Sequence, residues 1–120
     1  MEDLNRQVTD RLLDYGVSIL KLSGQLQLSS AGRHLGSQLL RSGTSAGAGY
    51  EEAREAQSPA DFIHQMHVVL KELRESQYWL KLIQRARLLK TESLTESIEE
   101  ARQLCDLIGK SLVTAKPEGL

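Results

Sequence analysis

An aspartate and two histidines at helical spacing are the first candidates for chemistry in this chain. Asp61, His64 and His67 follow one another at intervals of three, so in a helix they lie about one turn apart on the same side. Di-iron bundles use a Glu-x-x-His motif from each of two helices and further glutamates from two more. This chain has a single comparable motif, and residues 3–22 and 93–115 contain no matching histidine. We therefore interpret the histidines as solvent-facing or capping residues and expect no metal and no cofactor.

Carboxylates and hydroxyls offer a second route to catalysis. Glu72 and Glu75, with Glu52 on the preceding segment, could share a proton and act as acid and base. We favour ion pairing with neighbouring basic residues instead. The candidate partners are Lys71, Arg74 and Arg41. Ser42 and Ser45 have no base beside them in the sequence, and a hydroxyl without an adjacent base is a poor nucleophile. These patterns favour a protein that is not an enzyme.

The run of residues 43–49 is rich enough in glycine to suggest a phosphate-binding loop. That loop requires a lysine after its last glycine and a strand before it, and this run has neither. Both flanks have helical character, so Gly43, Gly47 and Gly49 each weaken a helix by about 0.8–1 kcal/mol relative to alanine. We expect close packing against this bare backbone, either by the aromatic-bearing helix that follows or by a neighbouring subunit.

Hydrophobic periodicity predicts an all-α chain that forms one domain over residues 1–120. Apolar residues recur at spacings of three and four, which places them on one face of each helix. Ser58 is a good N-cap, and Ser93 with Glu96 forms a capping box. The four expected helices cover about 3–22, 30–56, 59–89 and 93–115. Their alternation of four and three residues is typical of a helical bundle.

A second group of apolar residues on the segment 59–89 lies outside its main stripe. It includes Val68, Trp79 and Leu82. In a monomer these side chains would be exposed to water, and exposed apolar surface of this kind marks interaction sites. We therefore predict that the protein associates with copies of itself through these three residues.

Charge is uneven along the chain, although the net charge is only −1. Residues 59–90 carry six Lys or Arg against three Asp or Glu, and residues 91–120 carry the reverse. We favour solvated faces whose opposite charges help neighbouring helices to pair. The alternative is a binding surface for RNA or DNA. The candidate nucleic-acid-binding residues are Arg74, Lys81, Arg85, Arg87 and Lys90.

Composition indicates a soluble cytoplasmic protein that does not enter a membrane. The sequence contains no run of 18 apolar residues and begins with acidic rather than basic residues. Cys105 is the lone cysteine, which excludes an intramolecular disulfide and a cysteine-based zinc site. Its position on an apolar seam predicts a small core residue.

Several short motifs together resemble a known bacterial family. They are QLLRSGTS at 38–45, EA at 52–53, DFIH at 61–64 after Ser58, LKE at 70–72, Glu75 and YWL at 78–80. The chain resembles the four-helix-bundle proteins first seen as products of intervening sequences within 23S ribosomal RNA genes. That group also includes the accessory protein of diversity-generating retroelements.

The resemblance implies an antiparallel up-down-up-down bundle that assembles into a homopentamer around a central channel. The retroelement member is strongly basic, binds nucleic acid and contacts a reverse transcriptase. This chain differs from that member in its pI of 6.3, and from the family in Gly49, where an asparagine is common. The family's recurrent polar positions correspond here to Arg41, Ser42, Ser45, Glu52, Lys71, Glu72 and Glu75. We expect this structural polar network to tie the second helix to the third, or one subunit to the next.

The function that we predict is a non-enzymatic oligomeric adaptor or scaffold. Its candidate partners are further copies of itself and an RNA, a ribonucleoprotein or a reverse-transcriptase-like protein. Two alternatives remain open. One is a metal- or carboxylate-dependent enzyme that uses Asp61, His64, Glu72 and Glu75, and the other is a purely protein-binding regulatory bundle.

Overall fold

The structure is a computed structural model that describes the backbone of residues 2–115 and the side chains of residues 4–115. That part of the chain contains four helices and no strand. They are α1 (Glu2–Gly24), α2 (Ser30–Arg54), α3 (Pro59–Arg85) and α4 (Glu92–Ala115). The all-α prediction is therefore confirmed. Residue 1 and residues 116–120, which the predicted domain included, lie outside the described part.

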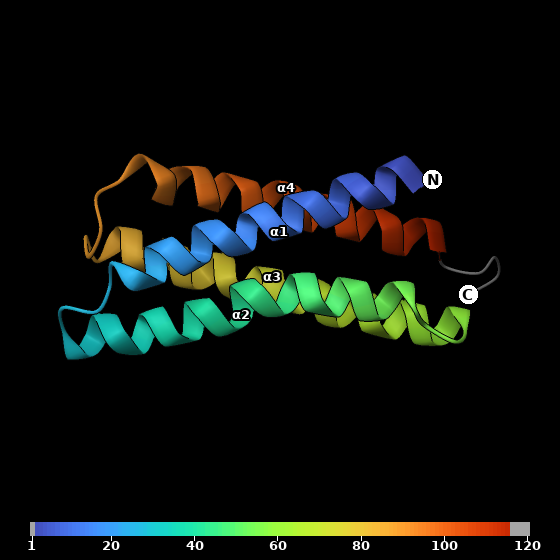
Figure 1. Cartoon of the computed structure of the whole chain (residues 1–120), viewed down its shortest axis with the longest axis horizontal. Coiled ribbons are helices and arrows are strands. Elements are labelled where there is room, and N and C mark those ends of the chain that lie inside the picture. The colour runs from blue at the N-terminus through green and yellow to red at the C-terminus, as the bar shows by residue number, and fades with distance from the viewer. Residues whose placement is uncertain (1, 116–120) are drawn as a thin grey trace.

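The four helices lie along the longest dimension of a molecule that measures 49 × 24 × 21 Å (Figure 1). α2 packs against α1 and α3, and α4 packs against α3 and α1. The pairs α1 and α3, and α2 and α4, therefore lie diagonally across the bundle. The α1–α2 and α3–α4 connections lie at one end and the α2–α3 connection at the other (Figure 1). All four helices thereby contribute side chains to one core.

One polar contact joins two diagonal helices inside that core. Tyr15 of α1 and Ser76 of α3 are both buried, and their hydroxyl oxygens lie 2.7 Å apart. The Ser76 hydroxyl donates to the carbonyl oxygen of Leu73 at 2.8 Å, which leaves Tyr15 as the donor to Ser76. Burial raises the pKa of the Tyr15 phenol above its ordinary value, so the group stays neutral. Because both hydroxyls have partners, their burial carries no penalty for an unsatisfied polar group.

The ends of α2 and α3 differ from the sequence prediction by a few residues. α3 begins as expected, with the Ser58 hydroxyl accepting a bond from the Asp61 amide at 3.1 Å. It ends at Arg85 rather than at residue 89, because the chain turns at Arg87 with a left-handed φ of 59°. α2 ends at Arg54 rather than at residue 56, since Ser58 must be extended to cap the next helix.

The first turn of α4 also differs in detail. The helix begins at Glu92, and the Leu94 amide donates to the Thr91 hydroxyl at 3.2 Å. Thr91 therefore takes the capping place that the sequence pattern assigned to Ser93. The Ser93 hydroxyl lies 3.0 Å from that of Thr91. The helix itself extends to Ala115, as the apolar spacing predicted.

The glycine-rich run is helical, but its neighbours are not the aromatic residues of α3. A Cβ at Gly43 would lie 2.8 Å from both γ-carbons of Ile19, and one at Gly47 would lie 3.6 Å from the Leu12 Cβ. Both neighbours belong to α1. At Gly49 the nearest atom belongs to an aliphatic residue of α3, Val69, at 3.2 Å. The predicted approach of α3 is therefore confirmed at Gly49, through an aliphatic rather than an aromatic side chain, whereas α1 supplies the neighbours of Gly43 and Gly47.

Candidate interaction surfaces

An ionic cluster connects α2 and α3 at the surface of the bundle. Arg41 of α2 forms ion pairs with Glu75 and, at 3.2 Å, with Glu72 on α3. The indole Nε1 of Trp79 donates to the same Glu75 carboxylate at 3.2 Å. The bonds from Trp79 and Arg41 lower the pKa of Glu75, and the bond to Glu75 raises the pKa of Arg41. A carboxylate held in its charged form by two donors is suited to joining helices and poorly suited to acting as a general acid.

The other predicted members of the polar network do not join this cluster. Ser42 is buried and donates to the Gln38 carbonyl at 2.9 Å, and Ser45 donates to the Arg41 carbonyl at 2.5 Å. Both hydroxyls therefore bond carbonyls of their own helix, and neither forms a hydrogen bond to α3 within the described chain. Glu52 and Lys71 are exposed and form no ion pair with any other described residue.

The predicted apolar interface on α3 is partly open to solvent. Val68 has 43% of its surface exposed, whereas Trp79 and Leu82 are half-buried. Tyr78 is exposed and packs edge-on against Trp79, with ring centroids 5.2 Å apart and an angle of 72° between the planes. The exposed surface of α3 therefore combines apolar side chains with the ionic cluster around Glu75.

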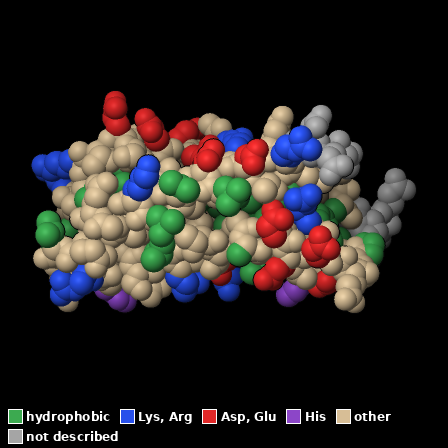
Figure 2. Space-filling model, in the orientation of Figure 1, with side chains coloured by type: hydrophobic (Ala, Val, Ile, Leu, Met, Phe, Trp, Pro, Cys, Tyr) green, Lys and Arg blue, Asp and Glu red, His purple; other side chains and the backbone are tan. Residues whose placement is uncertain are grey.

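A second exposed apolar surface lies along α1. Leu13, Val17 and Leu20 form a row with 64%, 48% and 53% of their surfaces exposed. Hydrophobic side chains appear in the middle of the face that α1 and α2 form, with charged groups toward its edges (Figure 2). We call these three residues the α1 ridge.

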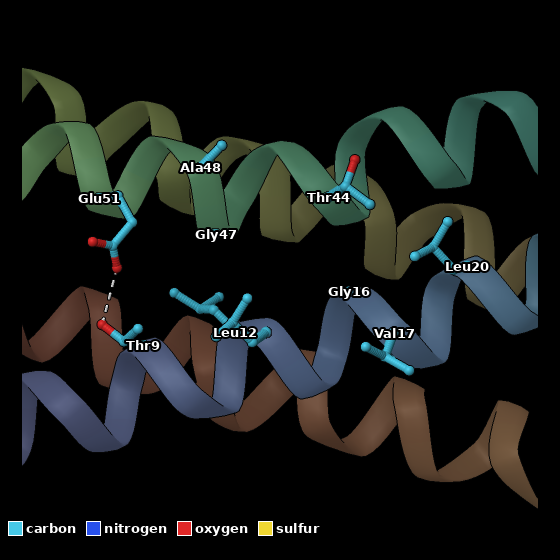
Figure 3. Close-up of a pocket in the computed structure, with 10 residues that line it drawn as sticks. Thr9, Leu12, Gly16, Val17, Leu20, Thr44, Gly47, Ala48 and Glu51 are labelled. Carbon is cyan, nitrogen blue, oxygen red and sulfur yellow. Dashed lines mark hydrogen bonds between the residues drawn. The ribbon is translucent and has the colours of Figure 1, made fainter.

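A groove of about 530 Å³ runs beside the α1 ridge, between α1 and α2. Leu12, Gly16 and Gly47 line it together with the ridge residues (Figure 3). At one end the Thr9 hydroxyl donates to the Glu51 carboxylate at 3.1 Å, as the dashed line in Figure 3 marks. Its lining is predominantly apolar, which suits a hydrophobic side chain or helix rather than a charged ligand.

The predicted nucleic-acid-binding residues are exposed, and they form two groups along α3 and the connection to α4. Lys81, Arg85, Arg87 and Lys90 lie within ten residues at the end of α3 and in the turn that follows. Arg74 lies nearer the middle of α3, where it lines a separate hollow together with Cys105 of α4. None of the five forms an ion pair with another residue of the described chain.

The histidine motif does not assemble a metal site within residues 2–115. His64 and His67 are exposed, and no group of three His, Cys, Asp or Glu side chains in this range could hold an ion. The Asp61 carboxylate accepts bonds from Gln65 at 3.1 Å and from the Gln57 amide at 3.4 Å. Asp61 therefore serves the start of α3, where a negative charge is favourable.

The fold and the motifs agree with a family that other proteins define. A family model described as 23S rRNA-intervening sequence protein matches residues 5–110. The chain belongs to this family. A solved structure, a protein of unknown function from the S23 ribosomal protein family of Bacteroides thetaiotaomicron, is 34% identical. The match covers 88% of this chain and 97% of that one, with a TM-score of 0.82. No curated protein matches the sequence.

In this member of the 23S rRNA-intervening sequence protein family, sequence analysis missed the α1 ridge. Beside its buried stripe, α1 has a second apolar row at positions 13, 17 and 20. The spacings of four and three in this row also define one helical face. Two apolar rows on one helix are the signal that could have revealed it.

Within the described residues, no helix is long and apolar enough to cross a membrane.

Proposed function

We propose that this protein is a non-enzymatic cytoplasmic adaptor that associates with copies of itself and binds structured RNA or a ribonucleoprotein. The nucleic-acid contact is the basic end of α3, defined by Lys81, Arg85, Arg87 and Lys90. A reverse-transcriptase-like complex is one ribonucleoprotein of the kind that the family resemblance suggests. Self-association would repeat this basic end several times in one particle and so increase its avidity for a long RNA.

The proposal depends mainly on one observation: within the described chain, no basic side chain at the end of α3 forms an ion pair with α4. Glu99 and Asp106 of α4 both pair with Arg102 on the same helix, and Glu100 pairs with Arg11 of α1 at 2.6 Å. The bond from Arg102 lowers the pKa of Glu99 to about 2, which reflects how fully that carboxylate is engaged. Within the described residues, no ion pair joins α3 to α4. Free lysine and arginine side chains in a cluster are what a phosphate backbone requires.

Several features support the architectural part of the proposal. Connections at alternate ends of the molecule support an antiparallel up-down-up-down order (Figure 1). Exposed apolar side chains on both α1 and α3 support self-association. The resemblance implies five copies, and light scattering of the purified protein measures that number directly. A monomeric mass at all concentrations would contradict self-association.

Binding of a labelled, structured RNA at several salt concentrations tests the nucleic-acid contact. The variant Lys81→Gln/Arg85→Gln should bind more weakly, because it removes two phosphate-binding charges without altering the core. The slope of log affinity against log salt should become shallower by roughly 1.5 for two lost phosphate contacts. The matched control Arg33→Gln/Lys71→Gln removes the same charge from exposed positions elsewhere.

Two results would contradict the nucleic-acid contact. One is wild-type binding that does not weaken as salt rises, because a phosphate contact must release counterions. The other is an equal loss of affinity in both double variants, which would indicate a general effect of net charge. Unchanged circular dichroism spectra would confirm that both variants are folded.

A further inference from the structure

We infer that Tyr78, which lies within a row of basic residues on α3, stacks on an unpaired base of the bound RNA. The inference rests on the proposed RNA binding and specifies which part of the RNA this surface takes. The basic residues are Arg74, Lys81 and Arg85, which we call the basic stripe, and Tyr78 lies between the first two. The tyrosine thereby connects Arg74 with the basic end of α3.

Tyr78 and the basic stripe share one face of α3. The spacings of four, three and four residues from Arg74 to Arg85 place all four side chains within about 60° of the helix circumference. The stripe extends about 16 Å along the helix axis. All four side chains are exposed, and no member of the basic stripe forms an ion pair with another described residue. Phosphates that follow this face therefore meet free positive charge on both sides of an aromatic ring.

Tyr78 differs from the other two tyrosines in its exposure. Tyr15 and Tyr50 are buried, and their hydroxyls form hydrogen bonds to other helices or to α1. Tyr78 has 58% of its surface exposed, and its ring packs against that of Trp79. The Trp79 indole is held in turn by its bond to Glu75. Because the Tyr78 ring is supported on one side and open to solvent elsewhere, it can accept a base with little loss of side-chain freedom.

The basic stripe and the predicted contact between copies occupy different flanks of α3. Trp79 bonds Glu75, which pairs with Arg41, so this flank turns toward α2. Arg74 lines a hollow together with Cys105, so the basic stripe turns toward α4. Self-association through the flank beside α2 therefore does not require the surface that we assign to RNA.

The chemistry of an exposed aromatic ring selects an unpaired base rather than a duplex. Bases inside a double helix are already stacked on their neighbours, whereas bases in loops, bulges and single strands can stack on aromatic side chains. Stacking accepts any base, since every base has an aromatic face. Basic residues alone would bind paired and unpaired RNA through their phosphates. Tyr78 therefore adds a preference for unpaired RNA without a preference for sequence.

Substitution of Tyr78 tests the inference with two labelled RNA probes, a hairpin with a single-stranded uridine tail and a blunt duplex. Tyr78→Leu should weaken binding of the tailed hairpin at least fivefold, because it removes the stacking surface. Its affinity for the duplex should stay within twofold of the wild-type value. Tyr78→Phe is the matched control, since it keeps the ring, and it should bind both probes within twofold of the wild type. Neither variant should change the slope of log affinity against log salt, because no charge is lost.

A 2-aminopurine in the tail reports the stacking itself through a loss of its fluorescence. We expect that loss with the wild type and with Tyr78→Phe, but not with Tyr78→Leu. Circular dichroism checks that both variants are folded.

Four results would contradict the inference. If Tyr78→Leu binds both probes as the wild type does, or loses affinity equally for both, stacking is wrong and the basic contact still stands. If Tyr78→Phe is as weak as Tyr78→Leu, the hydroxyl rather than the ring binds the RNA. A changed mass of Tyr78→Leu in light scattering would place Tyr78 in the contact between copies instead. A wild-type protein that binds neither probe would refute the proposed RNA binding together with this inference.

Discussion

Replacing Gly43 by alanine offers the sharpest test of how the glycine-rich run of α2 packs. The new Cβ would lie 2.8 Å from the Cγ1 and Cγ2 atoms of Ile19 and 3.2 Å from its Cβ. Ile19 is fully buried and β-branched, so it has little freedom to rotate away. Overpacking of this kind costs about 1–3 kcal/mol, whereas alanine gains about 1 kcal/mol in helix propensity. We expect a net loss of up to about 2 kcal/mol in the free energy of unfolding.

Gly47→Ala is the matched control because it lies one turn further along the same helix. Its Cβ would meet Leu12 at an ordinary distance of 3.6 Å, so only the gain in helix propensity should remain. That gain is about 1 kcal/mol in the direction of greater stability. Since the propensity term is common to both variants, their difference isolates the collision with Ile19. Urea unfolding at low protein concentration, monitored by circular dichroism, measures both values.

A double-mutant cycle identifies the atoms responsible. Ile19→Ala removes both γ-carbons that the new methyl group would strike. In that background Gly43→Ala should become stabilising, because the collision is gone and the propensity gain remains. If Gly43→Ala destabilises the protein equally in both backgrounds, the proposed collision is not the cause.

Three further predictions concern polar and titratable groups. Tyr15→Phe should lower the free energy of unfolding by about 1 kcal/mol, because it removes one buried hydrogen bond while Ser76 keeps its bond to a carbonyl; an unchanged urea midpoint would contradict it. Burial raises the pKa of the Cys105 thiol, so alkylation by iodoacetamide should be slower in the folded than in the unfolded chain at pH 8 and should keep accelerating above pH 9.0. Equal rates in the two states would show that the thiol is not shielded. Glu75 has a lowered pKa, so its contribution to stability is present above its ordinary value of 4.5 and is lost as pH falls through the lower folded value. Stability of Glu75→Gln should therefore depend less on pH in that acidic range, and an unchanged pH dependence would refute the role of Glu75.

The sequence could predict that Glu72 and Glu75 share a helix face, but it could not predict which basic residue pairs with them. Motif spacing placed Glu72 and Glu75 on one face of a helix, where ion pairing was the favoured interpretation. Which base they meet depends on the axial alignment of α2 and α3, and the structure selects Arg41. Ser42 and Ser45 were grouped with them by resemblance, yet their hydroxyls bond their own helix. Helical periodicity specifies the face of a residue but not the residue opposite.

The same distinction applies to charge. A basic segment next to an acidic one suggested pairing between the last two helices. In the structure Arg102 binds two acidic groups within α4, because residues three and four apart on a helix are already neighbours. Local ion pairs formed in this way leave the basic end of α3 free. The numbers of acidic and basic residues in each segment could not distinguish ion pairs within α4 from ion pairs between α3 and α4.

Four helices, their approximate bounds and the apolar face of each could be predicted from local sequence, because propensity, capping and periodicity act over a few residues. Which side chain lies against each face depends on how the helices pack, and the structure was needed to show it. It placed Ile19 of α1, rather than an aromatic residue of α3, over Gly43, and it left Gly16 beside an open groove. The two glycines are alike in the sequence. Their surroundings differ because one backbone faces the core of the bundle and the other faces a groove that is open to solvent.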